Sequence, residues 1–238
     1  MDKQYERISL FLKEEGLNKL QAAKVLIVGI GGVGGYAAEA LARTGIGHLV
    51  LMDHDVVSES NLNRQIFADY TSINQAKCEV MKKRIQSFSK TKVTCIQAFY
   101  NEETTIIDEA FDYVIDACDT LSAKVSMVEA CKQKTVSYIG CLGMANRIDP
   151  SKIIETTLDK TENDPLAKAF RQIVRKKEIK GKIKVVASKE LPFKQNTLVN
   201  PEGKTLKDKY PPASLIFVPA AAGLLLASIV TREIVERT

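Results

Sequence analysis

The stretch 24–55 constrains the fold most strongly, because it places a glycine-rich turn between an apolar segment and a run of small residues. Residues 25–28 have the β-branched and aliphatic side chains of a strand, the turn occupies residues 29–34, and a helix is expected to follow. Glycines let the backbone approach a phosphate, and the N–H groups and positive dipole of the helix N-terminus favour that anion. The stretch predicts a nucleotide-binding turn; the alternative is a structural turn in an α/β domain.

Asp53 supports the nucleotide interpretation. It closes the second predicted strand about twenty residues beyond the turn, where a carboxylate can accept hydrogen bonds from both hydroxyls of a ribose. Strand and helix patterns then alternate as far as residue 141. This alternation predicts a Rossmann-like α/β fold, with a mainly parallel sheet and helices on both faces.

The rest of the chain supplies the expected elements. Strands are predicted at 92–100, 113–117, 136–141, 153–158 and 183–188, and helices at 4–20 with a break near Gly16, 74–87, 104–110 and 122–133. A further helix should begin at Pro165, with Asp164 as its N-cap, and end by Gly181. We expect a long surface loop at 190–212.

The apolar run 214–230 raises the question of a membrane span. It is short for that purpose and is interrupted by Pro219, so we expect a strand turning into a buried helix and no stable membrane insertion. At 238 residues the chain fits one full α/β domain, divided here into an N-terminal helical arm (1–23), a nucleotide-binding core (24–145) and a C-terminal part (146–238) that adds strands and helices.

Charge and cysteine usage suggest where the protein works and on what. The first residues are charged and lack the pattern of a secretory signal, and the five cysteines form no Cys-x-x-Cys pair. Reduced thiols in the cytoplasm are therefore expected, without a zinc ribbon. Residues 168–189 carry nine basic side chains against Glu178 alone, whereas the chain as a whole has a net charge of +5. Nucleic acid is the natural partner for such a segment; the alternative is a solvated helix face.

The residues after Asp53 favour phosphate chemistry over hydride transfer. Arg64 and Lys77 would each deliver a cation close to the phosphate-binding turn, which suits nucleotidyl transfer. Asp119 follows a predicted parallel strand and is well placed to bind Mg²⁺. The alternatives are a surface charge for Arg64, a solvated helix residue for Lys77 and a helix N-cap for Asp119.

Taken together, these motifs resemble those of the ubiquitin-activating-enzyme-like (ThiF-type) adenylating superfamily. The resemblance rests on the GxGGxG turn, Asp53, Asn-x-Asn-Arg-Gln at 61–65, Gln-x-Lys at 75–77 and Asp-x-x-Asp at 116–119. The finer match is to the tRNA threonylcarbamoyladenosine dehydratases, through the stretches 39–47, 147–150, 160–168 and 217–219. One departure is the turn Gly143-Met144-Ala145-Asn146, which is bulkier than the small-residue turn of the family.

The resemblance implies a set of site residues. ATP would be bound by Gly29, Gly31, Gly32, Gly34, Asp53, Asp55, Asn61, Arg64, Gln65, Lys77 and Asp119, with Asp53 on the ribose and Asp119 also holding Mg²⁺. Arg64 and Lys77 would be catalytic, together with Arg7, which such homodimers supply to the ATP of the partner subunit. Lys168, Arg171 and Arg175 are expected to contact tRNA.

The reaction that the resemblance implies is ATP-dependent dehydration of threonylcarbamoyladenosine in tRNA. The threonine carboxylate would be adenylated, and a group of the same modification would then displace AMP and close a ring. No enzyme cysteine is needed, and residues 145–213 contain none. Cys118 and Cys141 are expected to be buried strand residues.

Three competing functions stay open at this point. A sibling enzyme adenylates the C-terminal glycine of a ubiquitin-like sulfur carrier, so a sulfur-transfer or carrier protein is a further candidate partner. Such siblings generally have two Cys-x-x-Cys zinc pairs. This chain has no such pair and instead carries the basic segment 168–189. The second competing function is that of an NAD-dependent oxidoreductase, and the third is that of a catalytically silent tRNA-binding module.

Overall fold

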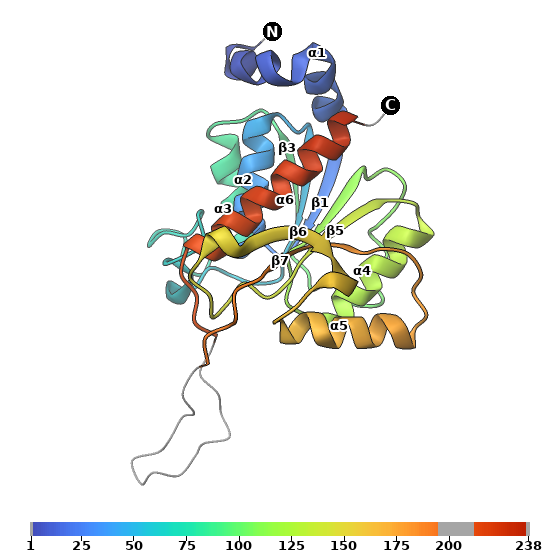
Figure 1. Cartoon of the computed structure of the whole chain (residues 1–238). Helices are drawn as coiled ribbons and strands as arrows, with labels where there is room; N and C mark the ends of the chain where they lie inside the picture. Colours follow the sequence, from blue (N-terminus) through green and yellow to red (C-terminus); the bar gives the residue numbers. More distant parts are fainter. Residues whose placement is uncertain (1, 195–211, 237–238) are drawn as a thin grey trace.

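The centre of the protein is a twisted sheet with helices on both faces, as the sequence predicts (Figure 1). The computed structural model describes residues 2–194 and 212–236. Within them the seven strands lie in the order β3 (Lys92–Ile96), β2 (His48–Met52), β1 (Lys24–Val28), β4 (Tyr113–Asp116), β5 (Ser137–Cys141), β7 (Lys184–Ser188) and β6 (Ile153–Thr157). Neighbouring strands are parallel except β6, which pairs antiparallel with β7. The order reverses on either side of β1, which places a ligand crevice at the carboxyl ends of β1 and β4.

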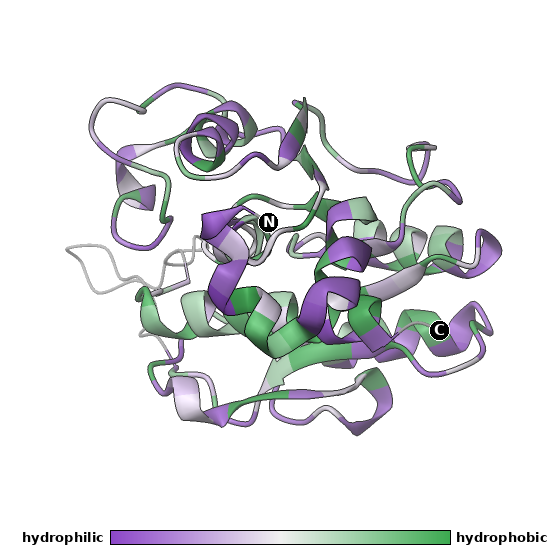
Figure 2. Ribbon diagram, turned by 90° about the horizontal axis from the view of Figure 1, so that it is seen from above, coloured by the Kyte–Doolittle hydropathy of each residue, from purple (hydrophilic) through white to green (hydrophobic). Residues whose placement is uncertain are grey.

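The two faces of the sheet carry separate cores because successive strand residues point to opposite sides. Val25 and Ile27 of β1 pack with α2 (Gly34–Thr44), α3 (Lys77–Gln86) and α6 (Phe217–Glu236). Leu26 and Val28 face the other way, toward α4 (Leu121–Gln133). A third cluster joins α4 to α5 (Pro165–Lys176) and β7. Figure 2 shows hydrophobic residues gathered along the central elements and hydrophilic ones on the peripheral turns.

The N-terminal arm consists of a short 3-10 turn (Lys3–Tyr5) and α1 (Glu6–Ala22). The helix is broken, as predicted, but the break lies at Lys13, which has a positive φ of 58°, and not at Gly16 itself. Gly16 instead packs against α6, where an added Cβ would lie 3.0 Å from a methyl group of Val235. A small residue is therefore required for helix contact and does not mark a turn.

The helix predicted at 104–110 does not form. Asn101 accepts a hydrogen bond from the backbone N–H of Glu103, and Asp108 accepts one from that of Ala110. Such local side-chain bonds compete with the helical ones. Three boundaries also differ: β3 ends at Ile96, α3 begins at Lys77, and α5 ends at Lys176.

The predicted strand at the start of the last apolar run is also absent, because residues 214–216 are irregular and α6 begins at Phe217. Among the described helices, α6 alone is long and apolar enough to cross a bilayer, yet half of its apolar window is buried within the fold. Gly223 lets it approach α2 so closely that an added Cβ would lie 2.4 Å from the carbonyl oxygen of Val33. The predicted loop 190–212 has no regular structure at 190–194 or 212, and its remaining residues lie outside the described part of the chain.

Candidate active site

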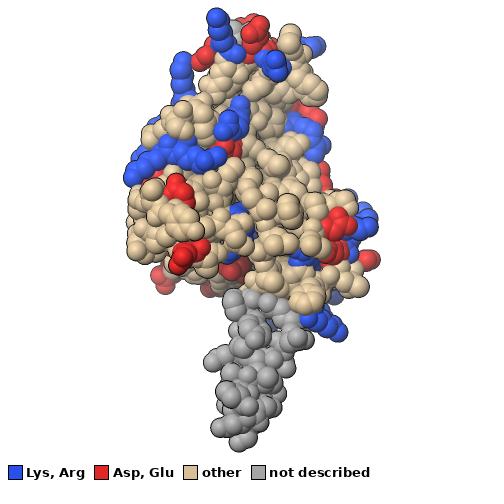
Figure 3. Space-filling view, turned by 90° about the vertical axis from the view of Figure 1, so that its left-hand side faces the viewer, with Lys and Arg blue, Asp and Glu red and all other residues tan. Residues whose placement is uncertain are grey.

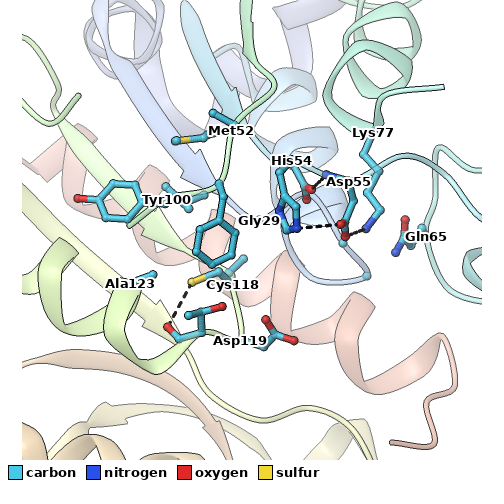
Figure 4. Close-up of a pocket in the computed structure, with 18 of the residues that line it drawn as sticks. Gly29, Met52, His54, Asp55, Gln65, Lys77, Tyr100, Cys118, Asp119 and Ala123 are labelled. Carbon is cyan, nitrogen blue, oxygen red and sulfur yellow. Dashed lines mark hydrogen bonds and ion pairs between the residues drawn. The ribbon is translucent and has the colours of Figure 1, made fainter. Parts of the chain in front are cut away.

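A pocket of about 350 Å³ opens at the carboxyl ends of β1, β2 and β4 (Figure 4). The sheet brings together residues that are far apart in the sequence, since the carboxyl ends of parallel strands share one edge. Of the predicted ATP-binding residues, ten line this pocket: Gly29, Gly31, Gly32, Asp53, Asp55, Asn61, Arg64, Gln65, Lys77 and Asp119.

The glycine turn is built so that only its backbone faces the pocket. Gly29 has a φ of 90°, and an added Cβ would lie 2.7 Å from the carbonyl oxygen of Ala117. Gly34 does not line the pocket; it supports the turn from beneath, where a Cβ would lie 1.9 Å from the Gly29 oxygen. No described side chain caps α2 at Val33, although the N–H of Gly35 donates to the carbonyl oxygen of Gly31. The positive end of the helix dipole therefore faces an anion at the turn without a competing side-chain cap.

Asp53 is held rigidly at the end of β2. One carboxylate oxygen accepts a hydrogen bond from the N–H of Ile30 at 2.6 Å, and the other accepts from the N–H of Asp55 at 2.8 Å. A carboxylate oxygen has more than one lone pair, so both can accept further hydrogen bonds. The side chain therefore has a fixed orientation beside the glycine turn, with capacity left for ribose hydroxyls.

Lys77, at the first turn of α3, reaches back to Asp55. Its Nζ donates to Asp55 Oδ2 at 2.6 Å, and His54 Nε2 lies 3.1 Å from the other oxygen (Figure 4). Burial alone would raise the pKa of Asp55, but the hydrogen bond and charge of Lys77 outweigh it and hold that pKa below its usual value. The ammonium is thus poised at the pocket by a carboxylate that stays ionised.

The loop between β2 and α3 carries the remaining predicted phosphate contacts. Arg64 donates to the carbonyl oxygen of Ser60 at 2.6 Å, which keeps its guanidinium at the pocket rim. Asn61 is buried and accepts from the N–H of Ser58, so part of its amide serves the loop itself. Gln65 is 5% exposed, and its Oε1 has no hydrogen-bond partner within the described residues. A buried amide in this state is suited to a bound ligand.

Two aromatic residues that the sequence pattern did not indicate complete the pocket. Phe99 and Tyr100 follow β3 and line the pocket, and the ring of His54 packs edge-on against Phe99 at 5.0 Å. The predicted strand at 92–100 concealed them, because it assigned them to sheet pairing. The available signal was an aromatic pair just after a parallel strand, at the edge where the other site residues gather.

Asp119 lies across the pocket from Lys77 (Figure 4). It is exposed and has neither a hydrogen bond nor an ion pair to any described residue. Just before it, Asp116 is wholly buried and pairs with Lys124, whose Nζ lies 3.0 Å from Asp116 Oδ1 and also donates to the carbonyl oxygen of Cys141. This network fixes the loop that presents Asp119.

The thiols near the pocket are unsuited to nucleophilic chemistry. Burial raises the pKa of Cys118 well above its usual range and raises the pKa of Cys141 to about 12. Since the thiolate is the reactive form, both groups are protonated and inert at neutral pH. Cys141 is a buried residue of β5, as expected, whereas Cys118 follows β4, is only partly buried and lines the pocket, so the expectation of a buried strand residue is wrong for Cys118.

A second cavity of about 290 Å³ continues from the first and shares Gly32, Arg64 and Asp119 with it. Its far wall is the turn 143–145, together with Leu166, Ser214 and Pro219. The sequence departure in this turn now has a structural explanation. Met144 packs into the core, and Asn146 adopts a left-handed φ of 60° and bonds to Ala213 through both its N–H and its side-chain oxygen.

Comparison with known proteins establishes the family. The ThiF family model matches residues 1–204. A tRNA threonylcarbamoyladenosine dehydratase of Bacillus subtilis is 37% identical over 241 residues, covering 98% of this chain and 95% of its own length. The chain belongs to the ThiF family and, within it, to the tRNA threonylcarbamoyladenosine dehydratases.

Solved structures of this family show the same fold. The E. coli tRNA threonylcarbamoyladenosine dehydratase in complex with AMP matches with a TM-score of 0.85 at 31% identity, covering 96% of this chain and 92% of that one. The complex of that enzyme with ATP matches with a TM-score of 0.84 at 30% identity, covering 97% and 93%. The ThiF resemblance and the Rossmann-like fold expected from the sequence are both confirmed.

Two sets of predicted family residues lie outside the pocket. Arg7 is exposed on α1, beyond the amino end of β1 and therefore at the end of the sheet opposite the pocket (Figure 1). Lys168 and Arg175 are exposed on α5, whereas Arg171 donates to the carbonyl oxygens of Thr161 and Leu158 and is a structural contact. Basic side chains are not confined to α5, since Lys and Arg also gather near α1 in Figure 3.

Proposed function

We propose that this protein catalyses the ATP-dependent dehydration of threonylcarbamoyladenosine in tRNA. The observation that carries the proposal is the convergence of the glycine turn, Asp53, Arg64, Lys77 and Asp119 on one pocket, in a chain that matches a dehydratase over nearly its whole length. A ribose acid, a backbone phosphate cradle and two cations are the groups that bind ATP and stabilise charge on its phosphates.

The reaction proceeds through an acyl-adenylate. The threonine carboxylate attacks the α-phosphorus of ATP, an oxygen–phosphorus bond forms, and pyrophosphate leaves. A nitrogen or oxygen of the same modification then attacks the activated carbonyl carbon, AMP leaves with one former carboxylate oxygen, and the ring closes. Because the second nucleophile belongs to the substrate, an effective molarity on the order of 10⁵–10⁸ M can drive closure without an enzyme thiol. The protonated state of Cys118 and Cys141 is consistent with this route.

The position of each residue in the two cavities indicates its role. Lys77 can exchange Asp55 for a phosphate oxygen, and Arg64 can grip phosphate from the rim. The acyl group would occupy the second cavity, which adjoins Asp119 and the glycine turn. The carboxylate of Asp119, which bonds to no residue within 2–194 or 212–236, fits Mg²⁺, which takes one or two protein carboxylates. Such an ion would neutralise charge on the phosphates.

We also propose an assembly and a location for the enzyme. Arg7 cannot serve the pocket of its own chain from the far end of the sheet, which supports a homodimer in which it reaches the ATP of the partner. We place the enzyme in the cytoplasm, where its tRNA substrate resides. A sulfur-transfer or carrier protein remains a candidate additional partner.

The decisive experiment is mass spectrometry of nucleosides from tRNA carrying threonylcarbamoyladenosine, after incubation with the protein, ATP and Mg²⁺. Wild type is expected to convert the nucleoside to a product lighter by one water. The Arg64→Ala variant should bind ATP less tightly and form product at least about 100-fold more slowly, as expected when one charge-stabilising group is lost. If the protein binds ATP but the nucleoside loses no water, the preferred substrate becomes a carrier protein in place of tRNA.

The proposed tRNA surface is tested with charge reversals on α5. The double variant Lys168→Glu, Arg175→Glu should weaken tRNA binding and reduce the slope of log affinity against log salt by about 1–2, one per lost phosphate contact. Arg171 is left unchanged because its guanidinium holds the fold. Lys90→Glu with Lys82→Glu is the control, since these lysines pair with Asp2 and with Glu79 on α3 and neither lies on α5. If the α5 variant and the control variant bind tRNA equally well, α5 is not the tRNA-binding surface.

A further inference from the structure

A buried ion pair stands behind the wall of the second cavity. The side chains of Arg147 and Asp164 are 2% and 1% exposed, and Arg147 Nη2 lies 3.6 Å from Asp164 Oδ2. Neither residue lines the ATP pocket. The stretches 147–150 and 160–168 carry the family resemblance, yet the proposed chemistry gives Arg147 and Asp164 no role.

The guanidinium of Arg147 forms hydrogen bonds with four backbone carbonyl groups. It donates to the oxygens of Gly143, Ala145 at 3.3 Å, Asn163 at 3.2 Å and Glu190 at 3.1 Å. Two of these carbonyls belong to the cavity wall, and the others belong to the segments on either side of it. One rigid fork of donors thus fixes three segments that are far apart in the sequence.

Asp164 holds the other side of the same turn. Its Oδ2 accepts from the N–H of Gly143 at 2.9 Å, and its Oδ1 accepts from the N–H of Ala167 as the N-cap of α5. An added Cβ on Gly143 would lie 3.1 Å from Asp164 Oδ2, so the contact leaves little room for movement. The carboxylate therefore joins the cavity wall directly to the helix that presents Lys168 and Arg175.

The pair is costly to bury and is weak evidence for stability, since buried ion pairs can often be replaced by apolar groups without loss of stability. What it supplies here is geometry. A displacement on the order of 1 Å in a substrate-positioning element can cost about 100-fold in rate. The cavity wall and the start of α5 are the two elements that this pair keeps in fixed relation.

We propose that Arg147 and Asp164 are positioning residues for the tRNA substrate. They hold the turn 143–145 at the wall of the second cavity and join it to α5. The modified base in the cavity and the tRNA body on α5 are thereby held at a fixed distance and orientation. This inference rests on the proposed function, because it concerns how that substrate is seated. Because neither residue lines the ATP pocket, we expect ATP binding to be independent of the pair.

The test separates tRNA from ATP in steady-state kinetics. Asp164→Asn keeps the size of the side chain and one acceptor oxygen but removes the charge. Arg147→Lys keeps the positive charge but lacks the several N–H donors of the guanidinium, and Arg147→Met lacks both the charge and the donors. For Asp164→Asn and Arg147→Lys we expect kcat/KM for the modified tRNA to fall about 10- to 100-fold while KM for ATP changes less than about twofold. Arg147→Met should give the larger loss, and wild-type kinetics in Arg147→Lys would overturn the role of the fork.

The control is Arg84→Met, which breaks the pair between Arg84 on α3 and the buried Glu39 on α2. Thermal unfolding and circular dichroism give the folded fraction of each variant. The control should lower stability but, per folded enzyme, leave kcat/KM for the modified tRNA within about twofold of wild type. If wild type dehydrates the tRNA and the folded Arg147 and Asp164 variants keep the wild-type kcat/KM for the modified tRNA, the inference is overturned and the proposed function stands. If wild type fails to dehydrate the tRNA, both are overturned.

Discussion

The variant Lys124→Met is expected to lower the free energy of unfolding by about 3–5 kcal/mol. Lys124 and Asp116 are both fully buried, and the ammonium donates to Asp116 Oδ1 and to the carbonyl oxygen of Cys141. Removing it leaves the carboxylate in the core with only Tyr138, at 2.7 Å, and the local contacts of Cys118. An ionised carboxylate buried without its counter-charge is strongly destabilising.

Urea denaturation at neutral pH measures this loss. The double variant Asp116→Asn, Lys124→Met should recover part of it, because no unpaired charge remains. A loss below about 1 kcal/mol for Lys124→Met would contradict the expectation, since surface ion pairs contribute that little.

The pH dependence of the difference follows from the pKa of Lys124. Burial alone would lower that pKa, but the charge of Asp116 outweighs it and the pKa lies above its usual value. A raised lysine pKa stabilises the fold fully below the unfolded-state pKa, and the contribution is lost as the pH rises through the folded-state pKa. The stability gap between wild type and variant should therefore be constant from about pH 6 to 9 and narrow only above about pH 10.5.

The variant Lys77→Ala is expected to lower kcat for dehydration by about 100- to 1000-fold, the usual cost of removing one preorganised charge-stabilising group. The Lys77 side chain is 8% exposed and lines the pocket, where its ammonium group lies 2.6 Å from the carboxylate of Asp55. Its loss should slow formation of the acyl-adenylate, measured as pyrophosphate release in a single turnover with excess enzyme.

Lys82→Ala is the matched control on the same helix. Lys82 pairs with Glu79 on the surface of α3, outside the pocket. Its turnover should stay within about twofold of wild type, in keeping with the small contribution of exposed pairs. Comparable rates for the two alanine variants would remove Lys77 from the proposed chemistry.

Much of the nucleotide site could be predicted because its signals are local. The glycine turn, the apolar strand before it and Asp53 after it each express a backbone preference within a few residues. Parallel strands then bring these local features to one edge of the sheet, so Arg64, Lys77 and Asp119 meet without further information. Phe99 and Tyr100 were not predicted as pocket residues, because aromatic residues are as common in strands as in pocket walls.

The tertiary structure decided the features that depend on distant partners. The N-cap role of Asp164 was visible from Pro165 beside it, but its bond to Gly143, 21 positions away, was not. Arg171 looked like a surface charge on an amphipathic helix, and only packing against Thr161 shows that it is a structural contact.

By itself, then, the sequence determined the alternation of strands and helices around the glycine turn, the turn itself and ten of the residues that line the pocket, because these follow from local conformational preference and strand direction. The tertiary structure alone decided that residues 104–110 are irregular, that Lys124 neutralises Asp116, and that Arg147 and Asp164 brace the cavity wall. Those outcomes depend on which polar groups are buried together, and the energy of a buried group depends on its neighbours in space rather than on its neighbours in the chain.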